Sequence, residues 1–397
     1  MPSVLSPRRL AVVGFLTFIA LGLAQGVLGV AWPTMRADFG RPLADLGTLL
    51  AISVGGYFLA GLAAGPLTRR HGTGKLLVGT LSLGTLALTL YAIAGSWPVL
   101  LLASTGLGFS GGLLDSVVNA YVALHHGTRT MNLLHAFFGI GATTGPLLVA
   151  TSLARGLSWR AAYVVVGCVE VLLLVTVYTV RKRWPEGPSA ASEGEHIGVV
   201  GPLVLGLLAL FFLHVGLEVT AGQWSYSLLT ESRDVGEFAA GLWVASYWGG
   251  LTGGRLLLGV IGNRVGPRRT LSLSMAGTVA GAAILWWDPA AFGMVGLPII
   301  GFSLAGIFPT LVTLTPSWVG AERAPGVIGY QVAAASAGSA ALPWVVSRLI
   351  DARNLEVLGP FLVAAALLMP VIYVFVDKQA NGKTEIRSAD SNRRLPS

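Results

Sequence analysis

The chain alternates between long apolar runs and short polar or charged segments. An α-helix needs about 20 apolar residues to cross the hydrocarbon core of a bilayer, and twelve runs reach that length. The predicted helices cover residues 10–32, 44–67, 75–94, 98–124, 130–153, 160–180, 201–229, 236–260, 269–287, 291–315, 324–349 and 357–377. The pattern predicts an all-α polytopic membrane protein with twelve transmembrane helices.

Two polar segments divide the chain. Residues 181–200 begin with Arg181-Lys182-Arg183 and continue as a stretch rich in Glu, Ser, Ala and Gly that cannot bury itself. We interpret this segment as a cytoplasmic linker between an N-terminal six-helix bundle, residues 1–180, and a C-terminal one, residues 201–377. The polar, basic tail at residues 378–397 is predicted to be disordered and cytoplasmic.

The two halves repeat. The loop Gly65-Pro-Leu-Thr-Arg-Arg-His-Gly is echoed by Gly259-Val-Ile-Gly-Asn-Arg-Val-Gly, 194 residues later. The same offset relates Gly65/Gly259, Arg70/Arg264, Gly72/Gly266, Lys75/Arg269, Phe18/Phe212 and Gly22/Gly216. A constant offset across several elements indicates duplication, so the bundles are expected to be pseudo-symmetric. Parallel repeats with a site between them are typical of alternating-access transporters.

Composition and charge narrow the class further. Apolar residues make up 54% of the chain and charged residues 11%, which excludes an ordinary soluble domain. The net charge of +8 does not indicate a nucleic-acid partner, because the basic residues cluster between apolar runs, where they set orientation. Their distribution predicts that both termini are cytoplasmic in a multi-pass protein of the cell inner (plasma) membrane. The first run, Leu10 to Trp32, lacks a credible cleavage site and is treated as a helix. A monomer is expected.

Asp115 is the first of three acids inside apolar runs. A charge at mid-membrane costs roughly 2.5 to 3.5 kcal/mol, so such a carboxyl normally faces a protein or water-filled interior and marks function. Asn119 lies one turn further on the same face. The alternative is a structural carboxyl that is hydrogen-bonded to a neighbouring helix.

Glu218 is the second acid, and His214 precedes it by four residues on the same helical face. An imidazole titrates near neutrality, so this pair could load and release a proton during a transport cycle. We therefore assign proton coupling to Asp115, Glu218 and His214. The alternative is a buried polar pair that only fixes helix packing.

Other polar residues in the runs are candidates for solute binding or gating. Amides and an indole suit a hydroxylated solute, because they offer donors, acceptors and an apolar face. On this ground Gln25, Asn119, Trp224 and Gln331 are candidates, although Trp224 could equally be an interfacial anchor. Arg255 must find a carboxylate or carbonyls and is assigned to gating with Arg70, Gly72, Arg264 and Gly266. Glu170 is expected to have a structural or lipid-adjacent role.

Motifs of other chemistries are lacking in the sequence. His125 and His126 have no carboxylate or Cys partners in sequence, so no metal site is expected. No Ser/His/Asp set, Cys/His cluster or phosphate-binding loop with suitable spacing is evident, so the chain is predicted not to be an enzyme and to need no cofactor. The expected partners are a small-molecule solute, protons and the bilayer.

The repeated Gly-x-Leu-x-x-Arg-x-Gly loop at Gly65 to Gly72 resembles the signature loops of the major facilitator superfamily. The resemblance covers the whole chain and implies twelve helices in two bundles around a central site. The chain departs from the pattern, because Arg69 in the first loop and Asn263 in the second replace the acidic residue that is usual in the superfamily. A charge-relay gate would therefore have to use other residues here.

A finer resemblance is to the fucose-permease-like branch of sugar and proton symporters. It rests on Gly108 to Asp115 with Asn119, on Asn132 and His135, on Gly216 to Trp224, on Gly254-Arg255 and on Phe308-Pro309-Thr310. The resemblance implies symport of a sugar and adds Asn132 and His135 to the solute-binding candidates. That branch has an acid in its first helix, whereas this chain offers only Gln25 there.

Gly141-Ala-Thr-Thr-Gly145-Pro146 partly matches a motif of drug antiporters in the same helix, but the Gly-Gly that completes that motif is absent. A Gly/Pro bend also has a plain packing rationale. Our interpretation is a secondary active transporter of a small hydroxylated solute, a sugar, coupled to protons through buried carboxylates. The alternative is a proton-coupled exporter of amphipathic drugs or lipids.

Overall fold

The computed structural model describes residues 7–126, 128–184, 201–287, 292–320 and 322–393. Most of the predicted linker lies outside the described residues, and so does the side chain of Asn132. The first half contains α1 (Pro7–Asp38), α2 (Asp45–His71), α3 (Thr73–Ile93), α4 (Trp97–His125), α5 (Thr128–Ala154), α6 (Arg160–Val180) and η1 (Arg181–Arg183). The second half contains α7 (Pro202–Ser227), η2 (Leu228–Ser232), α8 (Glu237–Val265), α9 (Pro267–Trp287), η4 (Gly293–Val295), α10 (Gly296–Leu304), α11 (Ile307–Val319), α12 (Ala324–Ala352), η5 (Leu355–Val357) and α13 (Leu358–Arg393).

Ten helical segments among the described residues are long and apolar enough to cross a membrane, so the chain is a multi-pass membrane protein. α8 and α12 are not among the ten. α8 is rich in glycine and α12 in alanine and serine, and they carry Arg255 and Gln331 respectively. Both also pack against the opposite half of the molecule, α8 on α5 and α12 on α2. A helix face that meets protein does not need the hydropathy of one that meets lipid.

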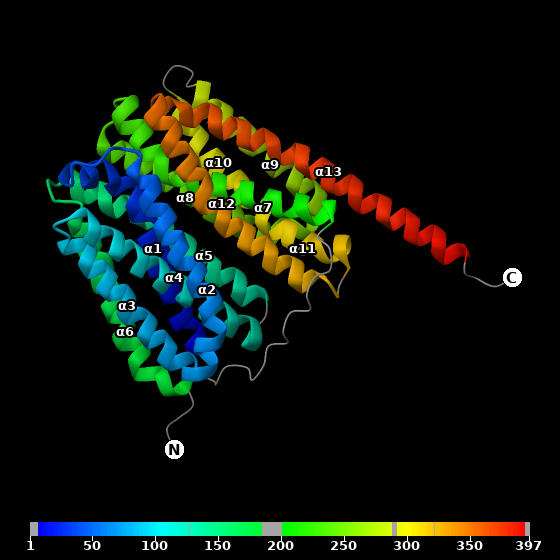
Figure 1. Ribbon diagram of the computed structural model, residues 1–397, viewed down its shortest axis with the longest axis horizontal. Helices are drawn as coiled ribbons and strands as arrows, with labels where there is room; N and C mark the ends of the chain where they lie inside the picture. Colours follow the sequence, from blue (N-terminus) through cyan, green and yellow to red (C-terminus); the bar gives the residue numbers. More distant parts are fainter. Residues whose placement is uncertain (1–6, 127, 185–200, 288–291, 321, 394–397) are drawn as a thin grey trace.

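Two elements differ from the prediction. The run predicted as one helix at residues 291–315 is divided between α10 and α11, which are separated by a turn at Ala305-Gly306. α13 continues to Arg393, so most of the tail predicted to be disordered is helical. The tail contains good helix formers such as Gln379, Ala380 and Lys383, which explains the continuation. Figure 1 shows this end of α13 projecting past the other helices.

The helices pack in two groups, and the second group repeats the packing of the first. In the first group α1 packs on α5, α2 on α4 and α3 on α6, and in the second α7 packs on α12, α8 on α10 and α9 on α13. Figure 1 shows the two groups side by side, the first in blue to green and the second in green to red. The groups meet mainly through α5 with α8, α2 with α12 and α1 with α7.

The duplicated loops have the same backbone geometry. Gly72 and Gly266 have φ values of 76° and 80°, in the left-handed region that favours glycine. Each separates two helices that follow one another directly, α2 from α3 and α8 from α9. The repeat read from the sequence therefore corresponds to a repeated turn.

The contacts between the groups repeat as well. Gly47 of α2 lies against Trp344 and Ser347 of α12, and Gly241 of α8 lies against Ala150 of α5. Gly47 and Gly241 are 194 residues apart, and so are Ala150 and Trp344. Both contacts lie toward the end of the molecule where α1 ends, which we call the Arg36 end; the opposite end, where α2 ends, is the His71 end. The two groups are thus held together near the Arg36 end by two equivalent contacts.

The glycines of the Gly141–Pro146 segment allow α5 to pack in direct contact with the backbone of α1. A Cβ added to Gly141 would lie 2.0 Å from the Ile19 carbonyl oxygen, and one added to Gly145 would lie 2.9 Å from the Leu23 carbonyl oxygen. Small residues allow this approach of two membrane helices. The packing rationale for the segment is therefore confirmed in α5.

We expect Gly141→Val to destabilise the protein strongly, because the new side chain would meet backbone that cannot move aside. Overpacking costs about 1–3 kcal/mol, and a clash with backbone lies at the upper end of that range. The control is Gly79→Val in α3, where an added Cβ meets nothing within 4 Å. Thermal unfolding in detergent should show a lower midpoint for Gly141→Val only. Equal midpoints for the two variants would contradict this account of the α1–α5 contact.

Candidate functional site

Glu218 lies at the centre of a polar group in the second half, which we call the Glu218 cluster: His214, Glu218 and Arg255. The Glu218 side chain is 3.7 Å from His214 Nε2 and 3.6 Å from Arg255 Nη2. His214 is 1% exposed and Glu218 8% exposed. The predicted same-face pair is confirmed, and the predicted need of Arg255 for a carboxylate is met by Glu218.

The cluster extends to the first half of the chain through His135 of α5. His135 is close enough to Arg255 of α8 for the guanidinium charge to act on the imidazole. Phe18 of α1 packs edge-on against His135, with ring centroids 5.7 Å apart. Phe308 of α11 lies 6.3 Å from the His214 ring. Ionisable groups of both halves therefore lie on helices that pack on each other, His135 on α5 and Arg255 on α8.

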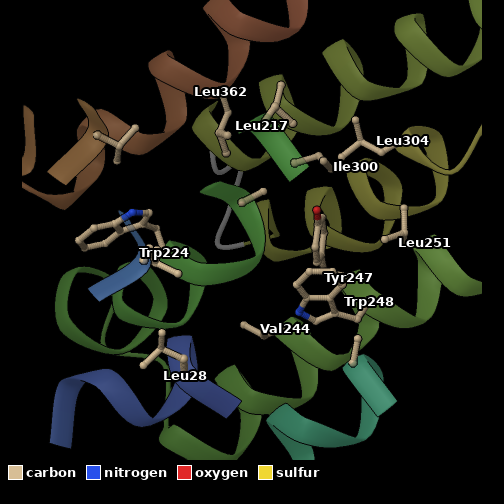
Figure 2. Packing of buried hydrophobic residues seen from close by; sticks show 14 of the residues in the cluster. Leu28, Leu217, Trp224, Val244, Tyr247, Trp248, Leu251, Ile300, Leu304 and Leu362 are labelled. Atoms are coloured by element: carbon tan, nitrogen blue, oxygen red, sulfur yellow. The ribbon is translucent and has the colours of Figure 1, made fainter. Parts of the chain in front are cut away.

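Tyr247 anchors the cluster from α8. Its hydroxyl donates a 2.7 Å hydrogen bond to the backbone carbonyl oxygen of Glu218. Figure 2 shows Tyr247 and Trp248 among the buried residues that hold α7 and α8 in place. Trp248 lies against Gly222, where an added Cβ would come within 2.5 Å of its ring. The backbone that carries Glu218 is thus fixed by hydrogen bonding and close packing.

Asp115 belongs to a second group, the Asp115 cluster, made of Tyr57, Asp115 and Asn119. The Tyr57 hydroxyl donates to Asp115 Oδ2 at 2.7 Å, and Asn119 Nδ2 donates to Asp115 Oδ1 at 2.9 Å. Both bonds lie within the first half of the chain. Tyr57 was not among the residues predicted from the sequence, although a tyrosine in an apolar run is a signal, because its hydroxyl needs a partner.

The two acids are not brought into one group. Each carboxylate has its partners on its own half of the chain, α2 and α4 for Asp115 and α7 and α8 for Glu218. Asp115 has a partly accessible side chain, whereas Glu218 is nearly sealed. A common function would have to couple the clusters through the packing of the two halves, α2 on α12 and α5 on α8, rather than through direct contact.

The predicted solute-binding residues lie in different surroundings. Gln25 is half-buried on α1, and its backbone carbonyl oxygen accepts a 3.0 Å bond from Gln223 of α7. Trp224 is fully buried, with an indole nitrogen that has no partner among the described residues, so its predicted alternative as an interfacial anchor is wrong. Figure 2 shows Trp224 and Leu28 on the same side of the group of buried hydrophobic residues. Gln331 is fully buried, and its amide donates to the Thr315 hydroxyl at 2.9 Å.

The predicted gating residues fall into two sets. Arg70 and Arg264 are exposed at the His71 end, next to the repeated turns at Gly72 and Gly266. Arg255 lies far from these turns, in the Glu218 cluster. No ion pair links Arg70 or Arg264 to an acid in the described part of the chain.

An ion pair that the sequence did not suggest joins the two halves at the Arg36 end. Arg36 Nη2 lies 2.5 Å from Glu231 Oε2, across the gap between α1 and η2. Nearby, Gly29 lies against the backbone of Gln223. A bond between residues 195 positions apart leaves no local pattern in the sequence.

Glu170 is buried, which agrees with a structural role and not with a lipid-facing one. Its carboxylate packs over Gly84, where an added Cβ would lie 2.0 Å from Glu170 Oε1 and 2.7 Å from the Ser110 hydroxyl. It lies where α6 meets α3 and α4, and in the described part of the chain no contact joins it to a residue of either cluster. Among the described residues no group of three or more His, Cys, Asp or Glu side chains is arranged to hold a metal ion.

The fold consists of two groups of membrane helices with the same packing, and ionisable residues lie where the groups meet. This arrangement is that of a solute transporter. The model of the Major Facilitator Superfamily matches residues 14–228 and 206–395, so the chain belongs to that superfamily. It is accordingly a transporter and not an enzyme.

Three relatives are similar over much of the chain. The glucose/mannose transporter GlcP of Bacillus subtilis is 22% identical over 90% of this chain and 92% of its own length. The 3-(3-hydroxy-phenyl)propionate transporter of Escherichia coli is 26% identical over 88% of this chain and 89% of its own. Bypass of stop codon protein 6 of Saccharomyces cerevisiae is 24% identical over 62% of this chain, and the match spans 56% of the yeast protein.

Solved structures share the fold at low identity. A bacterial homologue of the human lysosomal transporter Spinster, inward-facing and occupied, gives a TM-score of 0.75 at 13% identity over 94% of this chain and 97% of that one. The nucleoside transporter NupG gives 0.74 at 11% identity, covering 92% and 98%. The transporter FucP in its outward conformation gives 0.64 at 15% identity, covering 92% and 98%.

Proposed function

We propose that this chain is a secondary active transporter that moves a small hydroxylated solute, a sugar, across the inner (plasma) membrane in symport with protons. In this proposal α8 and α12 also cross the membrane, which makes twelve spans in two bundles, residues 1–180 and 201–377, with both termini cytoplasmic. The relatives named as glucose transporters support the substrate class.

The Glu218–Arg255 ion pair is the observation that carries the proposal. It is held inside the second bundle, and Arg255 lies on α8, which packs on the helix that carries His135 of the first bundle, at the contact that must move if the bundles rock. When Glu218 is ionised, its charge is balanced by Arg255. When Glu218 binds a proton, Arg255 loses its partner and its donors become free for solute hydroxyls or for His135.

Alternating access follows from such a change in partners. A conformational equilibrium responds only to a ligand that interacts differently with the two states. A proton on Glu218, and a solute bound to the released Arg255, would each change the contacts along α5 and α8. The Arg36–Glu231 pair and the Gly47 and Gly241 contacts keep the Arg36 end closed, so with the proposed topology this state opens toward the cytoplasm.

Binding and uptake by the purified protein test the function. Glucose, mannose, galactose and fucose are screened by thermal shift beside amphipathic drugs and lysolipids, since a bound ligand raises the unfolding midpoint. We expect a hexose to stabilise the protein and to accumulate in proteoliposomes under an inward proton gradient, and a protonophore to prevent this. Stabilisation by amphipathic compounds alone would support the exporter and refute the sugar assignment.

A further inference from the structure

A pocket of about 320 Å³ opens at the Arg36 end, between the end of α1, η2 and the start of α8. It is remote from both clusters described above. Its lining residues are Pro33, Thr34, Tyr226, Thr230, Glu231, Asp234, Val235, Gly236 and Glu237. The walls thus combine an aromatic ring and hydroxyl groups with three carboxylates.

The carboxylates give the pocket an excess of negative charge. Glu231 is balanced by Arg36 at 2.5 Å, whereas Asp234 and Glu237 form no ion pair in the described part of the chain. The nearby Arg233 is engaged by Glu356, at 2.8 Å between Nη2 and Oε2. Two carboxylates therefore face the pocket without a cationic partner, which favours a cationic ligand.

Tyr226 provides an independent indication of a ligand. Its side chain is only 1% exposed and lines the pocket, yet its hydroxyl has no hydrogen-bond partner among the described residues. An unsatisfied buried hydroxyl costs about 1–3 kcal/mol, so a group that fills this place would be stabilised. The Thr34 and Thr230 hydroxyls donate to helix carbonyls and keep acceptor capacity toward the pocket.

The arrangement of the carboxylates favours an organic cation over a compact metal ion. The three carboxylates do not converge as a metal-ligating group among the described residues. An organic cation is larger and can reach a carboxylate with its ammonium group while its hydroxyls reach Tyr226 and Thr230. We propose that this pocket binds a small hydroxylated organic ammonium ion at the Arg36 end, where its ammonium group competes with Arg36 for Glu231.

D-glucosamine and D-glucose form a matched pair of probes, because they differ only in the amine that replaces one hydroxyl. Binding to the full-length protein in detergent is measured by calorimetry at constant ionic strength, at a pH well below the pKa of the amine. We expect glucosamine to bind more tightly than glucose. The double variant Asp234→Asn/Glu237→Gln should lose about tenfold in glucosamine affinity, and Tyr226→Phe several-fold. Asn tolerates the positive φ of Asp234, 51°, so the loop should be retained.

Asp351→Asn is the control, because it removes one negative charge from the same end of the molecule but outside the pocket. It should bind glucosamine as the parent does. An equal loss in Asp351→Asn, or parental affinity in the double variant, would overturn the proposal. So would displacement of glucosamine by Mg²⁺ at lower concentration than by ethanolamine, which would indicate an inorganic cation site. A hexose site elsewhere in the protein would bind both sugars and would be unaffected by the pocket variants, so the loss in the double variant relative to Asp351→Asn tests this pocket separately from the sugar assignment.

Discussion

Glu218→Gln is expected to abolish solute accumulation driven by a proton gradient, while exchange of solute across the membrane is retained. Glutamine keeps the size and hydrogen-bonding capacity of the side chain but cannot bind and release a proton or balance Arg255. With one coupled proton, a gradient of one pH unit supports about tenfold accumulation. In proteoliposomes the internal and external concentrations should become equal in the variant, and counterflow should persist.

Asp115→Asn is expected to behave in the same way if the Asp115 cluster takes part in coupling. Glu170→Gln is the matched control, since Glu170 is also a buried acid within a helix of the first half but packs over Gly84 and makes no contact with either cluster among the described residues. It should accumulate solute like the parent. If Glu218→Gln and Asp115→Asn both concentrate solute as the parent does, the assignment of coupling to these acids is wrong.

Local periodicity was sufficient to predict most of the helices and one same-face pair in each cluster. His214 and Glu218 are four residues apart in a long apolar run, and a helix of 3.6 residues per turn places them on one face whatever surrounds it. The offset of 194 residues likewise predicted that Gly72 and Gly266 would occupy equivalent turns. Both inferences rely on backbone geometry alone, which is why they were confirmed.

Contacts between distant helices could not be predicted in the same way. The pairing of Arg36 with Glu231 depends on how α1 meets η2, and Tyr57 reaches Asp115 only because α2 packs on α4. Gln331 shows the reverse problem: a polar residue in an apolar run can face a solute or a neighbouring helix, and here its amide meets Thr315. Hydropathy does not distinguish these faces.

Turn chemistry explains the remaining difference from the prediction. The run at residues 291–315 is apolar throughout, so it was predicted as a single helix, but Gly306 and Pro309 interrupt its hydrogen bonding. The break separates α10 from α11, and α11 carries Phe308 to the side of His214. The interruption thus affects the candidate site, and a proline in an apolar run is the signal that could have found it.

Gly241→Trp is expected to open the Arg36 end without unfolding either bundle. An added Cβ would lie 2.2 Å from the Ala150 side chain of α5, which belongs to the opposite bundle, so a larger group must push the bundles apart there. Overpacking of about 1–3 kcal/mol at this contact raises the ratio of open to closed state by roughly 5- to 150-fold. The control is Gly253→Trp in the same helix, where an added Cβ meets nothing within 4 Å.

Ser347→Cys is the reporter for this opening. Ser347 is fully buried against Gly47, at the equivalent contact between α2 and α12, and the substitution is nearly isosteric. The single native cysteine, Cys168, is exposed and is first replaced by serine. Maleimide should label Ser347→Cys about tenfold faster with Gly241→Trp than with Gly253→Trp. An unchanged rate in a folded Gly241→Trp protein would mean that the two equivalent contacts do not open together, and the bundles could not then rock as rigid bodies.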